Sequence, residues 1–453
     1  MTSADNRKKV VLLDGTPDNR ESLAPVLAIL RETLAAAGNE VRVFTLRDMK
    51  LAHCIGCFGC WIKTPGICLQ PDAARDIAEA IVQSGMLVLF TPVTFGGYSP
   101  ELKLMVDRFV QLTLPCFITR QGEMHHPSRY LQTPRLVAVG VQRQTDDEEA
   151  GIFKILVGRN ALNFDSPSHA AEVVSLADGA EAIRNRFQAL LSKSDPYPLR
   201  EALDMLPTLP RVAAIPAAPG ARRALLIVGS PKVKRPSTSS VLGEHLLECL
   251  KQHGWQAESL TLRAGLRKQP EQEGARLLAA VDAADLLVLA FPLYVDSLPF
   301  LVTKALDLIS RHRLENRNRR AQSLVAIANN GFIDAHQNKV ALAICYQFAK
   351  QAEITWAGAL AMGAGEAVSS GRNLQGWLAR YPIIALRMAG EALAEGRPVP
   401  PQAVTLISNS PLPPILWRWL FTTIGTRAFR RQALANGISR QQLSNRPYAR
   451  SAP

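Results

Sequence analysis

Four cysteines stand close together in the first part of the sequence, in the run HCIGCFGCWIKTPGIC. Cys54, Cys57, Cys60 and Cys68 have the spacing C-x2-C-x2-C-x7-C. Thiolates two residues apart on a loop loosened by glycine can converge on one small object, which is what a metal ion or an iron-sulfur cluster requires. Thiolate sets suit iron and zinc alike, and free thiols in a structural loop are a third interpretation.

The other cysteines, Cys116, Cys249 and Cys345, are widely scattered. A disulfide framework is therefore the weaker interpretation, and the pattern favours a reduced compartment. The first residues, MTSADNRKKVVLLDG, carry a short apolar run that stops at Asp14 without a small-residue cleavage site, so they predict a strand and not an export signal. No stretch approaches the roughly 20 apolar residues of a membrane span. We expect a soluble, cytoplasmic protein.

The cysteine loop must be positioned by the elements around it, and residues 1–195 alternate strand and helix patterns. These residues are predicted to form one domain. Short apolar runs predict its strands at 9–14, 40–46, 86–90, 135–141 and 170–176. Because the strands are apolar on both faces, we expect a parallel sheet that is covered on each side.

Prolines recur between residues 196 and 221 and no period persists there, so this stretch is predicted to be a linker. The alternation of strands and helices then resumes over residues 222–400. Strands are predicted there at 223–228, 286–290 and 324–328. A chain of 453 residues exceeds what one core usually supports, which agrees with two domains.

The two halves share motifs at corresponding places. Gly-Thr-Pro at 15–17 and Gly-Ser-Pro at 229–231 each follow a first strand, and Thr-Pro-Val-Thr at 91–94 and Phe-Pro-Leu-Tyr at 291–294 each follow a third. Self-similarity on this scale indicates a duplicated fold. We predict two doubly wound α/β domains with five-stranded parallel sheets, whose ligands lie beyond the carboxyl ends of the strands.

Two loops of the second half carry groups that suit a phosphorylated ring. Residues 230–240 are rich in Ser and Thr and lead into a helix, so amides, hydroxyls and the helix dipole could hold a phosphate. The same residues also cap helices without any ligand. Tyr294 can supply a flat platform for a flavin ring, or it can be a partly buried core aromatic. The sequence leaves both alternatives open.

The last residues, 401–453, are predicted to form a basic helical tail. From Ser408 onward there are seven arginines and no acidic residue, out of a formal net charge of +13 for the chain. The charge is therefore a property of the tail and does not predict a nucleic-acid partner. Aromatic residues and arginines mix over 412–434. The tail is expected to pack on the second domain or on another subunit, with peripheral membrane contact as an alternative.

Both halves resemble flavodoxin-like oxidoreductases. Residues 1–195 resemble the iron-sulfur flavoprotein branch of the NADPH-dependent FMN reductase family, through Asp-Gly-Thr-Pro at 14–17, the cysteine run, Thr-Pro-Val-Thr-Phe-Gly at 91–96 and Leu-Lys-x-x-x-Asp-Arg at 102–108. Residues 222–400 resemble a related oxidoreductase through Gly-Ser-Pro-Lys at 229–232, Phe-Pro-Leu-Tyr-Val-Asp-Ser-Leu-Pro at 291–299, Asn-Asn-Gly-Phe at 329–332, His-Gln-Asn at 336–338 and Gly-x-Gly-Glu at 363–366. The resemblance implies a flavodoxin-like fold, FMN, a [4Fe-4S] cluster on Cys54, Cys57, Cys60 and Cys68, and electron transfer in a homo-oligomer.

In the first domain the resemblance implies that the FMN phosphate meets Thr16, Asn19 and Ser22. The ring would lie against Pro92, Val93, Thr94, Phe95 and Gly96. The sequence departs from the family pattern because Asp18 and Glu21 are opposed only by Arg20, and because Thr94 stands where an aromatic residue is common.

In the second domain the implied phosphate contacts are Ser230, Lys232, Ser237, Thr238 and Ser239. The implied ring contacts are Pro292, Leu293, Tyr294, Val295, Asn330 and Gly331. Lys232, Lys234 and Arg235 make this loop positive, which attracts a dianionic phosphate. If the chain holds one FMN, we expect it in the second domain.

The sequence contains no Ser-His-Asp arrangement, paired-carboxylate signature or P-loop, so no side chain is assigned as an acid or base. We expect a flavin-dependent oxidoreductase that moves electrons between NAD(P)H, or a small redox carrier, and a small-molecule or protein acceptor. The cysteine loop would be a second redox station. The alternatives are a cluster-free flavin or quinone reductase and a non-catalytic scaffold whose flavin sites have decayed.

Overall fold

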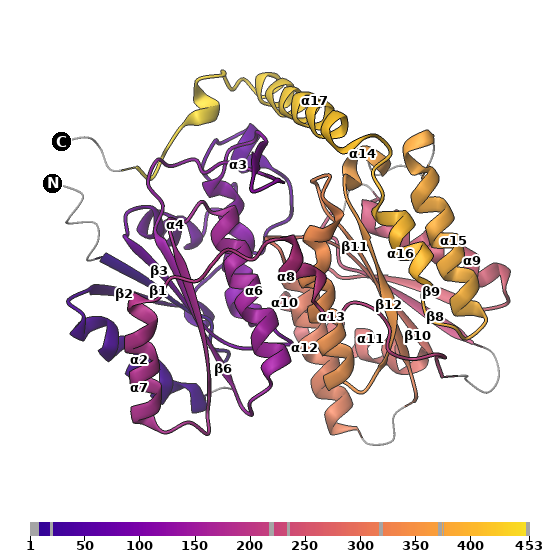
Figure 1. Cartoon of the computed structure of the whole chain (residues 1–453), viewed down its shortest axis with the longest axis horizontal. Coiled ribbons are helices and arrows are strands. Elements are labelled where there is room, and N and C mark those ends of the chain that lie inside the picture. Colours follow the sequence, from indigo (N-terminus) through magenta and orange to yellow (C-terminus); the bar gives the residue numbers. More distant parts are fainter. Residues whose placement is uncertain are drawn as a thin grey trace. The chain divides into compact units, whose positions relative to one another are not determined.

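The computed structural model describes residues 9–18, 21–216, 222–232, 236–316, 320–369, 374 and 376–449. Its contacts divide the chain into two compact units, which we call the first and the second domain. The first comprises residues 1–199 and 419–453, and the second comprises residues 200–418. Each contains one five-stranded parallel sheet with helices packed against it (Figure 1).

The sheet of the first domain has the strand order β2-β1-β3-β6-β7, and all neighbours are parallel. Val and Leu predominate in the central strands, which are buried on both faces. The strands are β1 (Lys9–Asp14), β2 (Glu40–Thr45), β3 (Met86–Pro92), β6 (Arg135–Gln142) and β7 (His169–Ser175). A separate antiparallel hairpin joins β4 (Ile118–Arg120) to β5 (Glu123–His125).

Helices cover this sheet, and α2 and α7 pack together on one face against the core that includes Val10, Leu12 and Val88. The α-helices are α2 (Ala24–Ala36), α3 (Gly59–Ile62), α4 (Ala74–Val82), α5 (Pro100–Val106), α6 (Asp147–Asn163) and α7 (Ala180–Ser192). The 3-10 turns are η1 (Glu21–Leu23), η2 (Leu46–Asp48), η3 (Asp107–Leu112) and η6 (Gln442–Ser444).

The second domain repeats the topology, with the strand order β9-β8-β10-β11-β12 and parallel pairing throughout. Its strands are β8 (Arg223–Val228), β9 (Gln256–Thr261), β10 (Leu286–Pro292), β11 (Ser323–Asn329) and β12 (Thr355–Met362). In each sheet the first strand lies between the second and the third, which is the flavodoxin-like order. The predicted fold class is confirmed.

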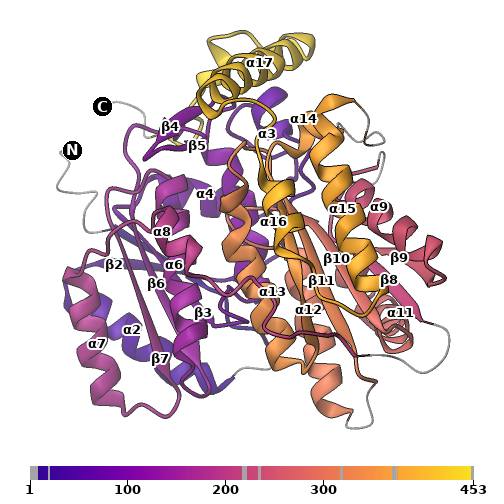
Figure 2. The same cartoon turned by 45° about the vertical axis from the view of Figure 1, so that its right-hand side comes forward.

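The helices of the second domain cover both faces of its sheet (Figure 2). One face carries α9, α15 and α16, whose apolar residues form a core with β8, β10, β11 and β12. The α-helices are α8 (Arg200–Asp204), α9 (Thr238–Gln252), α10 (Gly265–Lys268), α11 (Pro270–Ala283), α12 (Phe300–Glu315), α13 (Lys339–Gln351), α14 (Gly365–Ser369), α15 (Arg380–Ala394) and α16 (Pro401–Ser408), with 3-10 turns η4 (Ala335–Asn338) and η5 (Trp377–Ala379).

The tail differs from the expectation. Residues 401–418 belong to the second domain, where α16 contacts β12 and α15 and Arg418 pairs with Asp334 at 3.1 Å. The first residues of the long helix α17 (Pro414–Ala435) are assigned to the second unit, and residues 419–453 are assigned to the first. Packing of this part on the second domain is therefore wrong, because its apolar and backbone groups find their partners around the cysteine loop. No described helix is long and apolar enough to cross a membrane.

Candidate functional site

Each domain places a tight turn directly after its first strand. The amide of Gly15 donates to the carbonyl of Phe90, and the amide of Gly229 donates to that of Ala290, both at 2.8 Å. A Cβ atom at Gly15 would lie 2.6 Å from Leu102, and one at Gly229 would lie 2.2 Å from Val302. Both glycines are therefore required by the close approach of the helix that follows the third strand, α5 in the first domain and α12 in the second, and the two loops start from the same geometry.

In the second domain this loop leads into a capped helix. Ser237 is the N-cap of α9. Its hydroxyl accepts a hydrogen bond from the Ser240 amide at 3.1 Å, and the Ser240 hydroxyl accepts one from the Ser237 amide at 3.0 Å. This capping box is the alternative that the sequence left open, but it still leaves amides of the first turn without an intrahelical partner. Ser230 is buried next to the turn. The loop therefore combines hydroxyls with a helix N-terminus, which suits a phosphate.

Further contacts fix the first turn of α9 to the sheet. The Ser239 hydroxyl accepts a hydrogen bond from the Asn329 amide at 2.8 Å, and the Thr238 hydroxyl donates to the carbonyl of Gly365 at 3.3 Å. Lys232 pairs with Glu366 at 2.7 Å, and both side chains are substantially exposed. Because an exposed pair of this kind is weak, an anion can compete for the lysine. Lys234 and Arg235 lie outside the described residues.

The corresponding loop of the first domain is occupied by a carboxylate. Asp14, at the end of β1, is 1% exposed, and it accepts hydrogen bonds from the amide and the hydroxyl of Thr16 at 2.9 and 2.5 Å. Arg47 lies 3.8 Å from the same carboxylate. Ser22 is exposed, and Asn19 lies outside the described residues. The hydroxyl expected to meet a phosphate is therefore already engaged by a buried negative charge.

The loops expected to face the ring share a backbone shape. Thr94 and Gly97 exchange backbone hydrogen bonds at 3.0 and 2.8 Å, and Tyr294 and Ser297 do so at 2.9 and 3.1 Å. The two central residues of each turn have positive φ angles, 56° and 84° in the first domain and 49° and 54° in the second. The shared turn is a two-residue hairpin of the I′ kind.

The exposure of these loops differs. In the second domain Pro292, Leu293, Tyr294 and Val295 are all half-buried, so a flat ligand could contact them. In the first domain only Val93 and Thr94 are half-buried, while Pro92, Phe95 and Gly96 are buried.

Helix α6 covers the ring loop of the first domain. Ile152 would lie 2.8 Å from a Cβ atom at Gly96, and the Gly96 amide donates to the Glu149 carboxylate at 3.2 Å. The platform expected there is thus largely filled by protein.

An unused acceptor marks the sheet edge of the second domain. Asn330 is 4% exposed; its side-chain amide donates to the carbonyl of Asp334 at 2.9 Å, and its buried Oδ1 atom has no hydrogen-bond partner. A buried acceptor without a donor is unfavourable unless a ligand supplies one. Gly331 beside it has open space around its Cα. These groups fit the ring of FMN, and Asn329, which ties β11 to α9, is the contact that the sequence did not indicate.

The four clustered thiols lie in a common, partly buried region. Cys60 is buried, Cys54 and Cys68 are half-buried and Cys57 is exposed. Burial raises the pKa of Cys54 to about 12 and also raises the pKa of Cys60. The thiols of Cys54, Cys68 and Cys57 raise the pKa of Cys60 further. This mutual influence means that the four thiols are neighbours. Within the described ranges, however, no three His, Cys, Asp or Glu side chains are arranged to hold a metal ion.

Positive and donor groups surround these thiols. Arg108, which is bonded to Asp72 at 2.9 and 3.0 Å, opposes the rise in the pKa of Cys54, and Arg129 opposes that of Cys60. The side chain of Gln111 accepts a hydrogen bond from the Cys68 amide at 3.1 Å, while its buried Nε2 donor has no partner. Four thiols with buried cations and an unused donor fit an anionic iron-sulfur cluster by their chemistry.

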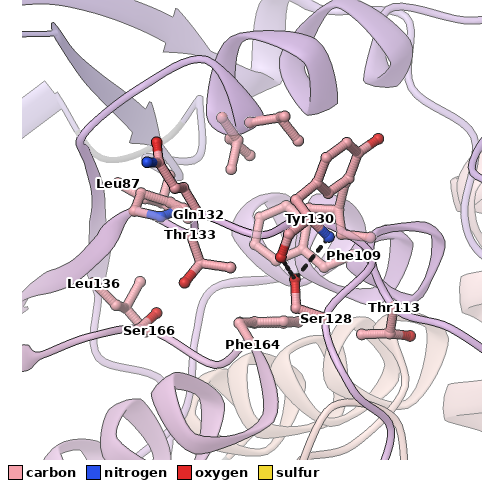
Figure 3. A pocket seen from close by; sticks show the side chains of 14 residues that line it. Leu87, Phe109, Thr113, Ser128, Tyr130, Gln132, Thr133, Leu136, Phe164 and Ser166 are labelled. Carbon is pink, nitrogen blue, oxygen red and sulfur yellow. Dashed lines mark hydrogen bonds between the residues drawn. The ribbon is translucent and has the colours of Figure 1, made fainter. Parts of the chain in front are cut away.

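One cavity lies at the opposite edge of the first sheet (Figure 3). Its lining includes Leu87 and Leu136, near the beginnings of β3 and β6, and is mainly apolar. Ser128 and Tyr130 in the lining are hydrogen-bonded to each other. The cavity is therefore separate from the carboxyl ends of the strands, where the ring loops lie.

Comparison with known families agrees with this duplicated architecture. Residues 8–128 match the family model described as NADPH-dependent FMN reductase, and residues 222–340 match that of the flavodoxin-like fold. The resemblance predicted for both halves is confirmed.

Among characterised relatives, an iron-sulfur flavoprotein of Archaeoglobus fulgidus is 28% identical over 100 residues, covering 22% of this chain and 48% of that protein. One of Methanocaldococcus jannaschii is 31% identical over 100 residues, covering 22% of this chain and 51% of that protein. The chain thus spans about half the length of these relatives. An NAD(P)H:quinone oxidoreductase from Methanothermobacter marburgensis has a similar structure at 15% identity, with a TM-score of 0.32 and coverage of 40% of this chain and 96% of that one.

Proposed function

We propose that the protein is an NAD(P)H-dependent flavin oxidoreductase that holds one FMN in its second domain. The observation that carries the proposal is the set of groups at one sheet edge. The first turn of α9, the half-buried Tyr294 and the unused Asn330 acceptor all lie beyond the carboxyl ends of β8, β10 and β11. Such an edge is where doubly wound sheets bind their ligands.

In this proposal the phosphate lies against Ser230, Lys232, Ser237, Thr238 and Ser239. The ring lies against Pro292, Leu293, Tyr294, Val295, Asn330 and Gly331. FMN, when bound, supplies the hydride and electron chemistry. The protein contributes amides that hold the phosphate, a side chain that stacks on the ring and an acceptor at Asn330 that orients a ring N–H group.

We also propose that Cys54, Cys57, Cys60 and Cys68 hold a [4Fe-4S] cluster that extends the electron path. The donor set, the nearby Arg108 and Arg129 and the names of the relatives support this part of the proposal. Rearrangement of the loop would have to bring the four sulfurs to one centre, which Gly56 and Gly59 allow in the backbone. A zinc ion or free thiols are the alternatives.

The acceptor in this proposal is a quinone, another small molecule or a protein electron carrier. We place the protein in the cytoplasm, where thiols stay reduced, as a homo-oligomer. Peripheral contact with an anionic membrane would use exposed residues of α17, among them Trp419, Ile424 and Arg427.

Anaerobic purification followed by cofactor analysis tests the proposal. Denaturation should release one FMN per chain, and iron and sulfide should be present in equal amounts. The purified protein should also oxidise NADPH or NADH with a quinone as acceptor. A colourless supernatant, from a protein that does not bind added FMN, would favour the scaffold. Flavin without iron would leave the cluster-free reductase.

A further inference from the structure

Arg129 is a buried cation with an unusual set of partners. Its side chain is 1% exposed, and among the described residues the groups to which its guanidinium donates are backbone carbonyls. The acceptors are Gln111 at 3.2 Å, Thr113 at 3.1 Å, and Leu443 and Asn445 at 2.9 Å each. One side chain therefore joins the segment after the cysteine loop to the end of the chain.

These carbonyls satisfy the donors of Arg129 but not its charge. Burial lowers the pKa of Arg129, and the groups that oppose this effect are the phenol of Tyr130 and the thiols of Cys60 and Cys116. None of the described carboxylates forms an ion pair with this residue. The Cδ atom of Arg129 would lie 3.2 Å from a Cβ atom at Gly66, in the loop between Cys60 and Cys68. Since a buried cation without an anion is costly, this position beside the cysteine loop calls for a negative charge on the sulfur side.

The segment that Arg129 binds covers the cysteine loop. We call residues 419–449 the C-terminal segment. Its Phe429 ring lies 5.2 Å from Trp61 and 5.7 Å from Phe58, edge to face in both cases. Ala433 and Leu443 share a buried cluster with Cys60 and Trp61. The segment thus forms an apolar wall on the loop that carries the thiols.

Two more contacts fasten the C-terminal segment. The Arg446 side chain donates to the carbonyl of Arg129 at 2.8 Å. Each arginine therefore binds the backbone of the segment that contains, or adjoins, the other. A Cβ atom at Gly66, whose φ is 89°, would lie 2.6 Å from the ring of Pro447. The loop between Cys60 and Cys68 is therefore shaped to receive the end of the chain.

We propose that the C-terminal segment forms a wall of the cysteine site and that Arg129 couples this segment to the site. Arg129 is the counter-cation of the thiolates, and its hydrogen bonds to residues 443 and 445 hold the segment in place as a clamp. When the site holds an anionic metal-thiolate centre, the charge of Arg129 is balanced and the segment is held firmly. When the site is empty, the clamp is weaker and the segment opens more often. The wall is independent of the proposed function, whereas the counter-charge rests on it.

The wall is tested on the metal-free full-length protein by alkylation of its thiols, followed residue by residue with mass spectrometry. Phe429→Ala should speed alkylation of Cys60 by about tenfold or more, because it removes ring contacts that oppose local opening. Trp419→Ala, which removes an exposed aromatic of the same helix, is the control and should leave the rate unchanged. Chemical denaturation of each variant reports unfolding of the first domain, and alkylation of the buried Cys345 reports unfolding of the second domain. An unchanged Cys60 rate in Phe429→Ala would overturn the wall.

The counter-charge is tested by trypsin cleavage within the C-terminal segment, which contains exposed Arg440. Loading the protein with ferrous iron and sulfide, or with Cd²⁺ as a thiolate probe, should slow cleavage several-fold in the wild type. Arg129→Met should lose this slowing, and Arg129→Lys, which keeps the charge, should retain much of it. Equal slowing in Arg129→Met would overturn the coupling.

The outcomes separate this inference from the proposed function. If neither iron with sulfide nor Cd²⁺ binds, the cluster and the counter-charge both fall, while the alkylation rates still decide the wall. If the metal binds and the FMN content of the variants is unchanged, but cleavage does not respond to loading, the coupling alone is wrong.

Discussion

The two domains have the same sheet order, the same glycine turn and the same ring-loop hairpin. They differ in what fills the loop after the first strand, which is expected to bind a phosphate and which we call the phosphate loop. Asp14 and Val228 occupy the same place at the end of the first strand. The carboxylate accepts a hydrogen bond from the hydroxyl of Thr16. The buried valine cannot do so, and the Ser230 hydroxyl accepts the Lys232 amide at 3.4 Å, which leaves its own hydrogen to be donated. One side chain beneath a turn that both domains share can therefore separate a loop that suits an anion from one that repels it.

The cysteine loop lies in the domain with the filled phosphate loop. The first domain has thus kept the fold, while its distinctive groups are the thiols, the buried arginines and the C-terminal segment. The second domain keeps the groups that suit a flavin. In the proposed function the duplication divides two redox cofactors between two copies of one architecture.

The largest effect on FMN affinity is expected when the carboxylate of the first domain is introduced at the equivalent position of the second. Val228→Asp should weaken FMN binding at least about a hundredfold, because a buried carboxylate would engage Ser230 and repel the phosphate. FMN affinity is measured by quenching of flavin fluorescence in the deflavinated protein. Asp14→Val is the matched control and should leave this affinity unchanged. Equal affinities in wild type and Val228→Asp would place the flavin elsewhere.

Acid should affect the first domain through an ion pair beside its cysteine loop. Burial alone would raise the pKa of Asp72, but hydrogen bonds from Arg108 and from the amides of Ala52 and Ala74 outweigh it and lower the pKa. Because the folded value lies below the unfolded one, near 3.9, the contribution is complete above about pH 4 and is lost as the pH falls further.

Asp72→Asn should therefore destabilise the first domain by about 2 kcal/mol at pH 7 and reduce the acid sensitivity of its unfolding. Chemical denaturation at pH 7 and at pH 3 measures both effects, with the transition of the second domain as the internal reference. A variant whose stability falls with acid as steeply as that of the wild type would contradict this role for Asp72.

The ring loop offers a smaller contrast. Tyr294→Ala should weaken FMN binding by about tenfold, since stacking on an aromatic contributes about 1–3 kcal/mol. Thr94→Ala changes the equivalent residue of the first domain and should have no effect on the affinity. If Tyr294→Ala binds FMN as tightly as the wild type, Tyr294 is the core aromatic that the sequence also allowed.

The sequence was sufficient for the fold because its central strands are continuous apolar runs and its turns repeat. The sequence patterns predict every strand of the first sheet, but they predict neither β9 nor β12 of the second. Strand β9 lies at a sheet edge and is largely exposed, so its pattern is weak. The engagement of Thr16 by Asp14 and the contacts of Arg129 with residues 443–445 depend on packing between distant segments, which no local pattern reports.

The smallest expected effect concerns the caps of the two phosphate-loop helices. Helix α9 has a side-chain cap at Ser237, whereas α2 begins after Leu23 without one. In the flavin-free protein, Ser237→Ala should destabilise the second domain by about 1 kcal/mol, the usual value of an N-cap. Ser22→Ala, next to the uncapped start of α2, should leave the first domain unchanged. Thermal denaturation of both variants measures the two changes in stability. Equal destabilisation of the two domains would contradict the proposed difference between the capped start of α9 and the uncapped start of α2.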